Sequence, residues 1–370
     1  MEFTVRKYDI LREIGLTQGV VEKKNTIPIL ANVLIDADGD YIQISATDLE
    51  LGIKCRCPAK IKKAGSITTP AKNFLDIIRA LPDDDIKVKS LENNWVQINC
   101  ASASFKIVGL PKDNFPNLPE SSKPVVDLPS RILLNIINKT VFAIASEESR
   151  YTFNGALLLL RPLSVTMVTT DGHRLAHIET QVRFEHLTSE MRTLIPKKAL
   201  AELQRLLSEA EEQDVVSFSK DETHLFFRIK NRLMISRMLT GQFPNYEAVL
   251  PKENSRVVVL ERERLGAAIK RVALLADDKS RSIKICLDKN QMEISAANAE
   301  LGEAKESLEA TYSGSPVQIG FNCQYLLDFI AATEDDKISL EFKDDQSAGQ
   351  MRPANEEECR YRYIVMPMRL

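Results

Sequence analysis

An internal repeat of 126 residues limits what this chain can fold into more than any other feature of its sequence. The segment from Phe74 to Leu81 has apolar residues at i, i+3, i+4 and i+7, which predicts a helix with one apolar face. Pro70 stands just before this segment, where a helix can begin. Similar segments follow Pro196 and Asn322, each 126 residues further along. An acidic loop and an alternating strand come after each helix. The chain therefore holds three copies of one unit.

The flanks of these helices repeat with the same period. A strand that ends in a polar turn precedes each helix, at 42–48, 166–171 and 292–298, and each unit begins with a strand and a further helix. The first two units close on Phe-Pro-Asn, at 115–117 and 243–245. We expect the order β-α-β-β twice per unit, which is an α+β domain with two helices packed on antiparallel sheet. The expected domains are 1–122, 123–252 and 253–370.

Length and composition fit three such domains, because each third of the 370 residues is long enough to bury a core of its own. The net charge of -3 excludes a uniformly basic protein but leaves room for a locally basic face. The six cysteines include no C-x-x-C pair, so we read them as free thiols in a reducing compartment. No signal peptide and no membrane-spanning apolar run are visible, which predicts a cytoplasmic location.

Cations recur on the polar side of the repeated helix. Lys72 and Arg79 lie seven residues apart, nearly two turns, and opposite the apolar face. The second unit has Lys198 and Arg205 in these positions, whereas the third unit has uncharged residues. A solvated helix face is the alternative interpretation for any single cation. Cations repeated by domain symmetry favour a surface that contacts the DNA backbone without reading bases, and that binds in a salt-dependent way.

The apolar C-terminal run from Tyr363 to Leu370 is unusual for a chain end, and we expect it to form a last core strand, a binding surface, or both. Methionine side chains there suit a surface that accepts several partners. Over its whole length the chain resembles the bacterial DNA polymerase III beta subunit family, the sliding clamps. The residues that carry the resemblance are Thr26 to Asn32, Thr170 to Ala176, Phe243 to Tyr246, Thr311 to Gly314 and Val365 to Leu370.

The resemblance implies a head-to-tail homodimer that forms a six-domain ring around duplex DNA, with helices lining the hole. Such a ring tethers the replicative polymerase to DNA and makes synthesis processive. The implied partners are duplex DNA of any sequence, a second copy of the chain, the DNA polymerase III alpha subunit, the clamp loader, and other polymerases and repair proteins. The polymerases, the clamp loader and the repair proteins bind through a short hydrophobic motif of the Gln-x-x-Leu-x-Phe type. No membrane partner and no cofactor are implied.

The resemblance also implies three sets of site residues. We expect DNA contacts at Lys24, Lys72, Arg79, Lys139, Arg150, Tyr151, Lys198 and Arg205. The groove for the partner motif is expected to include Phe153, Thr170, Gly172, His173, Arg174, Leu175, Pro244, Val249, Asn322, Tyr325, Val365, Met366, Pro367 and Met368. Phe105 and Ile107 are expected to meet Leu274 and Leu275 of the partner subunit, with packing inside one unit as the alternative. Ala248 and Ser280 depart from the family pattern and leave the preferred motif open.

The sequence allows two other classes of function to be considered for this chain: an enzyme and a protein-binding scaffold. An enzyme could use Asp171 and His173 as an acid–base pair, but the intervening Gly172 favours a turn, and no G-x-S-x-G, H-E-x-x-H or P-loop motif is present. A repeat scaffold that binds only proteins would leave the aligned cations unexplained. The sequence therefore predicts a non-catalytic protein without a metal site, and ring opening by a separate ATP-driven protein, since the chain has no nucleotide-binding motif.

Overall fold

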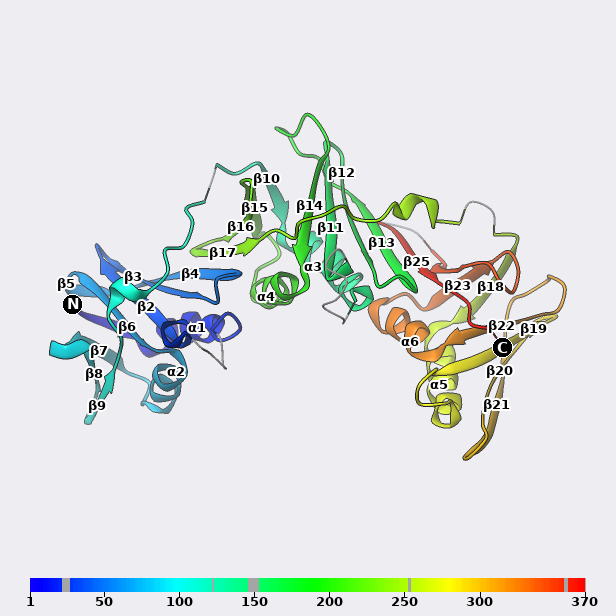
Figure 1. The fold of residues 1–370 in the computed structure, drawn as a ribbon, viewed down its shortest axis with the longest axis horizontal. Helices are drawn as coiled ribbons and strands as arrows, with labels where there is room; N and C mark the ends of the chain where they lie inside the picture. Colours follow the sequence, from blue (N-terminus) through cyan, green and yellow to red (C-terminus); the bar gives the residue numbers. More distant parts are fainter. Residues whose placement is uncertain (22–26, 122, 146–152, 252–253, 356–358, 370) are drawn as a thin grey trace. The chain divides into compact units, whose positions relative to one another are not determined.

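The computed structural model describes residues 1–21, 27–121, 123–145, 153–251, 254–355 and 359–369. The chain divides into two compact units, one of residues 1–133 and 198–238, the other of residues 134–197 and 239–370. Figure 1 shows the helices and strands of both units. None of the described helices is long and apolar enough to cross a membrane.

The first unit contains the whole first repeat and about half of the second. The first repeat comprises β1 (Glu2–Arg6), α1 (Lys7–Thr17), β2 (Asn32–Asp38), β3 (Tyr41–Thr47), β4 (Leu51–Pro58), β5 (Lys60–Lys63), β6 (Gly65–Pro70), α2 (Ala71–Ala80), β7 (Asp85–Ser90), β8 (Trp95–Cys100) and β9 (Ala103–Val108). The second repeat comprises β10 (Val126–Pro129), α3 (Ser130–Asn138), β11 (Gly155–Arg161), β12 (Ser164–Thr170), β13 (Arg174–Gln181), β14 (Met191–Pro196), α4 (Lys197–Leu207), β15 (Val215–Lys220), β16 (His224–Ile229) and β17 (Arg232–Arg237).

The third repeat lies entirely in the second unit and has the same order of elements. It comprises β18 (Arg256–Glu261), α5 (Arg262–Val272), the short 3₁₀ helix η7 (Ala273–Leu275), β19 (Ser282–Asp288), β20 (Gln291–Asn298), β21 (Gly302–Glu309), β22 (Val317–Asn322), α6 (Cys323–Ala332), β23 (Lys337–Phe342), β24 (Gly349–Pro353) and β25 (Cys359–Val365). Each repeat is thus a β-α-β-β-β half followed by a second such half, which confirms the predicted α+β repeat.

The predicted order β-α-β-β was wrong by one strand in each half. The missed strands include β4, β9 and β21, in which charged or polar residues alternate with the rest. Strands with a fully buried face carry a clear apolar alternation, but β9 contains no buried residue and β21 contains none either. Both lie at the edge of a sheet, where one row of backbone groups has no partner strand among the described residues.

An eight-stranded antiparallel sheet in the first unit joins two repeats, in the order β10-β15-β16-β17-β4-β3-β2-β6. The join is the pairing of β17 with β4, which runs from Arg232 opposite Cys55 to Ser236 opposite Leu51. A second sheet, β5-β1-β7-β8-β9, leaves β9 at its edge. The polypeptide of the second repeat therefore completes the first half of the first repeat.

The second unit is built by the same rule. Its eight-stranded sheet has the order β14-β11-β12-β13-β25-β24-β23-β18, and β25 of the third repeat pairs with β13 of the second. The remaining sheet, β21-β20-β19-β22, leaves β21 at its edge. Because the sheets cross from repeat to repeat, the two compact units divide the second predicted domain, and the proposed boundaries at 122 and 252 stay a prediction.

The predicted helix faces are buried as the sequence pattern requires. Phe74, Ile78 and Leu81 are buried, and Ile77 is half-buried. In α6 the side chain of Asn322 accepts hydrogen bonds from the backbone N–H groups of Gln324 and Tyr325, which caps the start of the helix. The cysteines of the described residues are free thiols, four of them buried.

Candidate DNA-facing cations and partner-binding surface

Two of the predicted DNA contacts lie on an open helix face. Lys72 and Arg79 are exposed on α2. Lys72 makes no ion pair with any residue that the structure describes, and Arg79 lies 3.6 Å from the carboxylate of Asp76 in a pair exposed to solvent. Exposed pairs of this kind contribute at most about 1 kcal/mol, so both cations are available to a phosphate. Lys24, Arg150 and Tyr151 lie outside the described residues.

The cations of α4 are held by the first repeat instead. The ammonium group of Lys198 contacts the carboxylate of Asp48 in the turn between β3 and β4. The guanidinium group of Arg205 donates to the backbone carbonyls of Gly15 and Leu16 near the end of α1, and it lies 2.8 Å from Glu202. Carbonyls at the end of a helix attract cations because they carry partial negative charge. The expectation that these cations form an open line equivalent to Lys72 and Arg79 was therefore wrong for Arg205, which is half-buried.

Lys139 is also engaged within the protein. It follows the end of α3, and its ammonium nitrogen lies 5.5 Å from the centre of the Tyr361 ring. The Tyr361 hydroxyl donates to the Lys139 carbonyl at 2.7 Å, and burial raises the pKa of this tyrosine. The sequence predicted that Lys139 lies on an exposed face. In the structure it is half-buried beside an aromatic ring.

An apolar cluster covers the face of the second unit's large sheet that lies away from α6. Its buried members are Leu157, Leu159, Val168, Leu175, Leu194, Tyr246 and Ile364, and Leu239, Phe243, Leu250 and Ala348 pack against them. Leu175 and Ile364 stand opposite each other on β13 and β25 and so share one face. Beside the cluster, Met366 and Val249 are each 44% exposed. We call this set of residues the junction cluster.

The junction cluster includes a residue that the sequence prediction missed. Ile364 was passed over in favour of Val365, but successive side chains on a strand point to opposite faces. Val365 stands opposite Arg174, and its side chain and that of Phe321 both lie beside Gly349. The alternation of Tyr363, Ile364 and Val365 in β25 is the signal that could have found it.

Arg174 ties the helix side of this sheet together and does not share the face of the junction cluster. Its guanidinium group bonds to the carboxylates of Asp171 at 3.0 Å and Asp328 at 2.5 Å, and to the backbone carbonyl of Phe142 at 2.7 Å. The same group lies 4.4 Å from the centre of the Tyr325 ring. With 10% of its side chain exposed, Arg174 acts inside the protein.

The other predicted groove residues surround the turn between β12 and β13. The Thr170 hydroxyl donates to the Arg174 carbonyl and accepts from the N–H of Gly172, which has a φ of 91°. His173 is exposed, and its carbonyl accepts from the N–H of Met366 at 2.9 Å. The remaining positions lie at the surface or partly below it: Phe153, Pro244, Pro367 and Met368.

The possible acid–base pair proves to be a turn. One carboxylate oxygen of Asp171 accepts from the backbone N–H groups of His173 and Arg174, at 2.9 and 3.0 Å. Its other oxygen pairs with the Arg174 side chain. A carboxylate used in this way stabilises the loop and is not free to move protons. Among the described residues, no group of three or more His, Cys, Asp and Glu side chains could hold a metal ion.

Repeated α+β domains, joined by sheets that cross between them and carrying binding surfaces in place of a catalytic centre, define a clamp-type protein. Family models for the N-terminal, central and C-terminal domains of the DNA polymerase III beta subunit match residues 1–119, 127–245 and 247–369. The chain belongs to this family, the bacterial beta sliding clamps. Its function is that of a DNA polymerase sliding clamp, a non-catalytic factor that gives the polymerase processivity.

Individual relatives match the chain from end to end. The beta sliding clamp of Pseudomonas putida is 33% identical and that of Vibrio cholerae 32% identical, with 100% of both chains covered in each case. A crystal structure of the sliding clamp from Pseudomonas aeruginosa superimposes with a TM-score of 0.94 at 31% identity and 100% coverage of both chains. A Caulobacter crescentus clamp with a polyethylene glycol bound to a putative beta-motif tethering region has a TM-score of 0.94 at 32% identity, covering 100% of this chain and 99% of that one.

His177 beside the junction cluster gives the second unit a defined response to acid. Burial lowers the pKa of His177 to about 4 from an ordinary value of 6.5, and its ring lies 5.7 Å from that of Tyr246. Below pH 6.5 the unfolded chain binds a proton that the folded chain refuses, so stability falls as the pH drops from 6.5 to 4 and levels off below 4. The loss from this residue should be about 3 kcal/mol.

Chemical denaturation between pH 7 and pH 4 measures this contribution. Replacing His177→Gln should flatten the pH dependence over that window by roughly the same amount. His186→Gln, an exchange of an exposed histidine, serves as the control and should leave the profile as it is. Equal slopes for His177→Gln and the unchanged chain would show that this histidine is not the group responsible.

Proposed function

We propose that two copies of the chain close into a ring around duplex DNA through β9 of one subunit and β21 of the other. The observation that carries the proposal is the pairing rule of the two large sheets. The last strand of the second repeat pairs with β4 of the first, and the last strand of the third repeat pairs with β13 of the second. Among the described strands, the counterparts that this rule leaves without such a partner are β9, the last strand of the first repeat, and β21, which holds the place of β4 and β13 in the third repeat. A second copy would pair both by closed two-fold symmetry.

The same rule gives the register of the proposed interface. Arg232 follows the two-residue turn of its hairpin and stands opposite Cys55, which in turn stands opposite Ile44. In the first repeat the residue that corresponds to Arg232 is Ala103, which follows the turn between β8 and β9. In the third repeat the residue that corresponds to Cys55 is Glu306, which stands opposite Ile294. Counting along antiparallel strands then places Phe105 opposite Ala304 of the partner subunit and Lys106 opposite Glu303 of the partner subunit.

Exposed apolar groups at the two edges support this register. Phe105 is 37% exposed on β9, and Leu274, in the helix η7 that contacts β21, is 77% exposed. Phe105 and Ile107 lie on the face opposite to Lys106. They are therefore the residues of β9 that would meet Leu274 and Leu275 of the partner subunit, as the family resemblance implies.

A charge exchange tests the proposed register. Lys106→Glu should weaken the dimer about tenfold, because it sets two like charges opposite each other across the interface. Adding Glu303→Lys in the same chain should restore most of the affinity, since the pair is only reversed. Sedimentation across a dilution series reports both results. Lys63→Glu, on the strand at the other edge of that sheet, is the control, and a double variant no tighter than Lys106→Glu would overturn the register.

DNA would pass through the ring, with Lys72 and Arg79 as its best available contacts. Both are exposed on α2, while Lys198, Arg205 and Lys139 have partners inside the protein. Contacts between lysine or arginine and phosphate do not depend on sequence and weaken as salt is raised. Few and weak contacts suit a ring, which stays on DNA by enclosing it.

Retention on circular DNA distinguishes enclosure from ordinary binding. After loading by a clamp loader, the protein should remain on closed circular duplex through gel filtration at 0.5 M salt, and it should be lost when the circle is cut once. Leu274→Asp, which places a charge in the proposed interface, should not be retained on the circle. Retention that is equal on circular and linear DNA would contradict the ring, because a bound protein that does not encircle DNA is indifferent to free ends.

Partner proteins would dock on the junction cluster. The apolar residues around Leu175 and Ile364, with Met366 and Val249 partly exposed beside them, suit the leucine and aromatic side chains of a short hydrophobic motif. The proposed partners are the DNA polymerase III alpha subunit, the clamp loader, and other polymerases and repair proteins.

We also infer three structural domains, 1–122, 123–252 and 253–370. Each boundary lies where the sequence passes from one repeat to the next.

Binding of a labelled motif peptide tests this surface. Met366→Glu should weaken a fluorescent peptide of the Gln-x-x-Leu-x-Phe type at least tenfold, because it sets a charge beside the apolar cluster, and deletion of Met368 to Leu370 should also weaken it. Leu163→Glu introduces the same charge at another exposed apolar residue of the second unit, a leucine that is 63% exposed, and should have no effect. Unchanged affinity in both the Met366→Glu and the deletion variants would place the motif elsewhere.

A further inference from the structure

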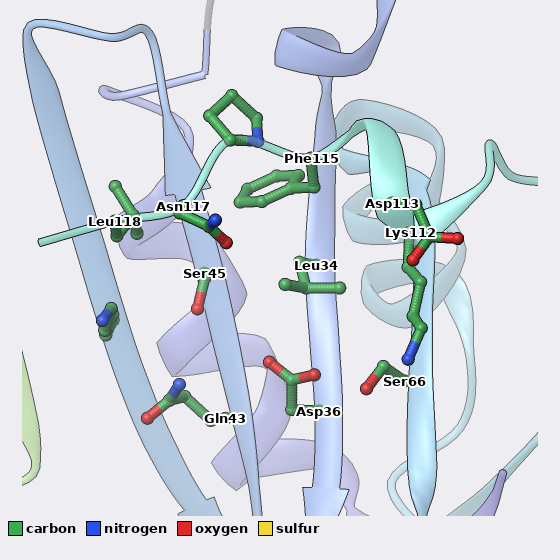
Figure 2. Close-up of a pocket in the computed structure, with 12 residues that line it drawn as sticks. Leu34, Asp36, Gln43, Ser45, Ser66, Lys112, Asp113, Phe115, Asn117 and Leu118 are labelled. Carbon is green, nitrogen blue, oxygen red and sulfur yellow. The ribbon is translucent and has the colours of Figure 1, made fainter.

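The first repeat has a pocket that the proposed function leaves unused. It has a volume of about 490 Å³ and opens on the outer face of β2, β3, β4 and β6, beneath the chain segment 112–118 (Figure 2). We call it the first-repeat pocket, and the residues that define it are Asp36, Gln43, Ser45, Lys54, Lys112 and Leu118. All of them belong to the first compact unit.

Two apolar anchors hold the segment that walls this pocket. Phe115 packs with Ile29 and Leu30, and Leu34 of the pocket floor packs against the same cluster. Leu118, three residues further on, packs on a second cluster that contains Ile235. Leu118 passes so close to Gly52 that a Cβ atom on this glycine would lie 2.6 Å from its Cδ2 atom. The wall is therefore fixed on both sides of the opening (Figure 2).

The pocket occupies the place in its repeat that the junction cluster occupies in the next one. Leu34 stands opposite Ser45, as Leu157 stands opposite Val168 in the second repeat. The walls correspond as well, because the Phe-Pro-Asn sequence at 115–117 recurs at 243–245. In the second repeat the floor is apolar and the space is filled by Phe243 and Tyr246. In the first repeat polar side chains replace the apolar floor, and the space stays open.

Lys54 is the unusual group in this pocket. It is half-buried on β4 and makes no ion pair with any residue that the structure describes. Burial lowers the pKa of Lys54; the carboxylates of Glu120 and Asp36 raise it, and Arg56 and Arg228 lower it. Because the pKa stays lowered, the two carboxylates compensate this cation only in part, so a further anion would stabilise it, and such departures from good packing concentrate at functional sites.

The other polar groups limit what the anion can be. Asp36 on β2 is half-buried and also lacks an ion pair among the described residues, and Gln43 stands opposite it on β3. Lys112 reaches from the wall toward this end of the pocket (Figure 2). The carboxylate of Asp36 repels a compact multivalent anion such as phosphate. It accepts hydrogen bonds from N–H groups, however. The amide oxygen of Gln43 already accepts from Arg56 at 3.1 Å and has a second lone pair for another donor, so a peptide with its own donors and one carboxylate fits both ends.

We propose that the first-repeat pocket binds an extended acidic segment of a partner protein, with Lys54 as the counter-ion of a glutamate or aspartate side chain. Asp36 and Gln43 accept hydrogen bonds from the N–H groups of the segment, and Lys112 adds a second positive charge at the rim. The inference rests on the proposed function only in taking partner proteins as the source of the segment. It assigns them a second contact, polar where the junction cluster is apolar.

Peptide titrations followed by NMR test the proposal. Two-dimensional ¹H–¹⁵N spectra of the full-length, ¹⁵N-labelled protein are recorded by a relaxation-optimised method. The probe is the blocked peptide Gly-Ser-Glu-Ser-Gly, which should shift resonances of β2 to β4 and of segment 112–118 with millimolar affinity. The same peptide with Gln in place of Glu should bind at least tenfold more weakly, and so should the acidic peptide to Lys54→Met. Lys60→Met, an exposed lysine of β5, is the matched control and should bind as the unchanged chain does.

Three results would overturn the proposal: equal binding of the Glu and Gln peptides, unchanged binding to Lys54→Met, or the same shifts with inorganic phosphate at equal concentration. The last result would mean a simple anion site. Lys54→Met should unfold at a temperature no lower than the unchanged chain, so a loss of binding cannot be attributed to unfolding. Met366→Glu should keep the acidic peptide while losing the motif peptide, so failure at the junction cluster is distinguished from failure at this pocket.

Discussion

Backbone pairing between strands of neighbouring repeats is the interaction on which the rest of this structure depends. Where β17 meets β4, and where β25 meets β13, hydrogen bonds run without interruption from one repeat into the next. A half-repeat of four strands would otherwise present an unpaired edge, which invites uncontrolled association. The pairing covers one edge each of β17, β4, β25 and β13. The counterparts of these strands, β9 at the end of the first repeat and β21 in the first half of the third, stay at sheet edges among the described residues, and they are the edges that a second copy would cover in the proposed ring.

Side chains secure each junction in a different way. In the first unit Glu13 of α1 and Arg232 of β17 form a buried two-bond ion pair at 2.9 and 2.8 Å, and Glu209 joins it at 3.0 Å. In the second unit Arg174 forms the corresponding ion pairs, with Asp171 and Asp328. Removal of one partner from a buried pair leaves an uncompensated charge and destabilises by about 3–5 kcal/mol. Each junction is therefore held by ion pairs as well as by backbone pairing.

The repeats share a fold but differ in chemistry on their outer faces. The same place beneath a Phe-Pro-Asn segment holds a polar open pocket in the first unit and the apolar junction cluster in the second. On the helix side, α2 presents exposed cations, α4 uses its cations to bind the first repeat, and α6 has none at the corresponding positions. One scaffold therefore carries different surfaces, because the repeats differ at surface positions that do not alter the fold.

The sequence by itself determined the threefold repeat, its helices and most of its strands, because apolar periodicity is a local signal that recurs at a constant spacing. It also determined the family, through motifs such as Thr170 to Ala176. Only the tertiary structure decided that Ile364 and not Val365 joins the junction cluster, since that depends on the register of β25 against a strand almost 190 residues earlier. It likewise decided that Arg205 is held at the end of α1, where helix carbonyls compete for a cation that the sequence pattern leaves exposed. Contacts between residues so distant in the chain follow from strand pairing across repeats, which no local pattern contains.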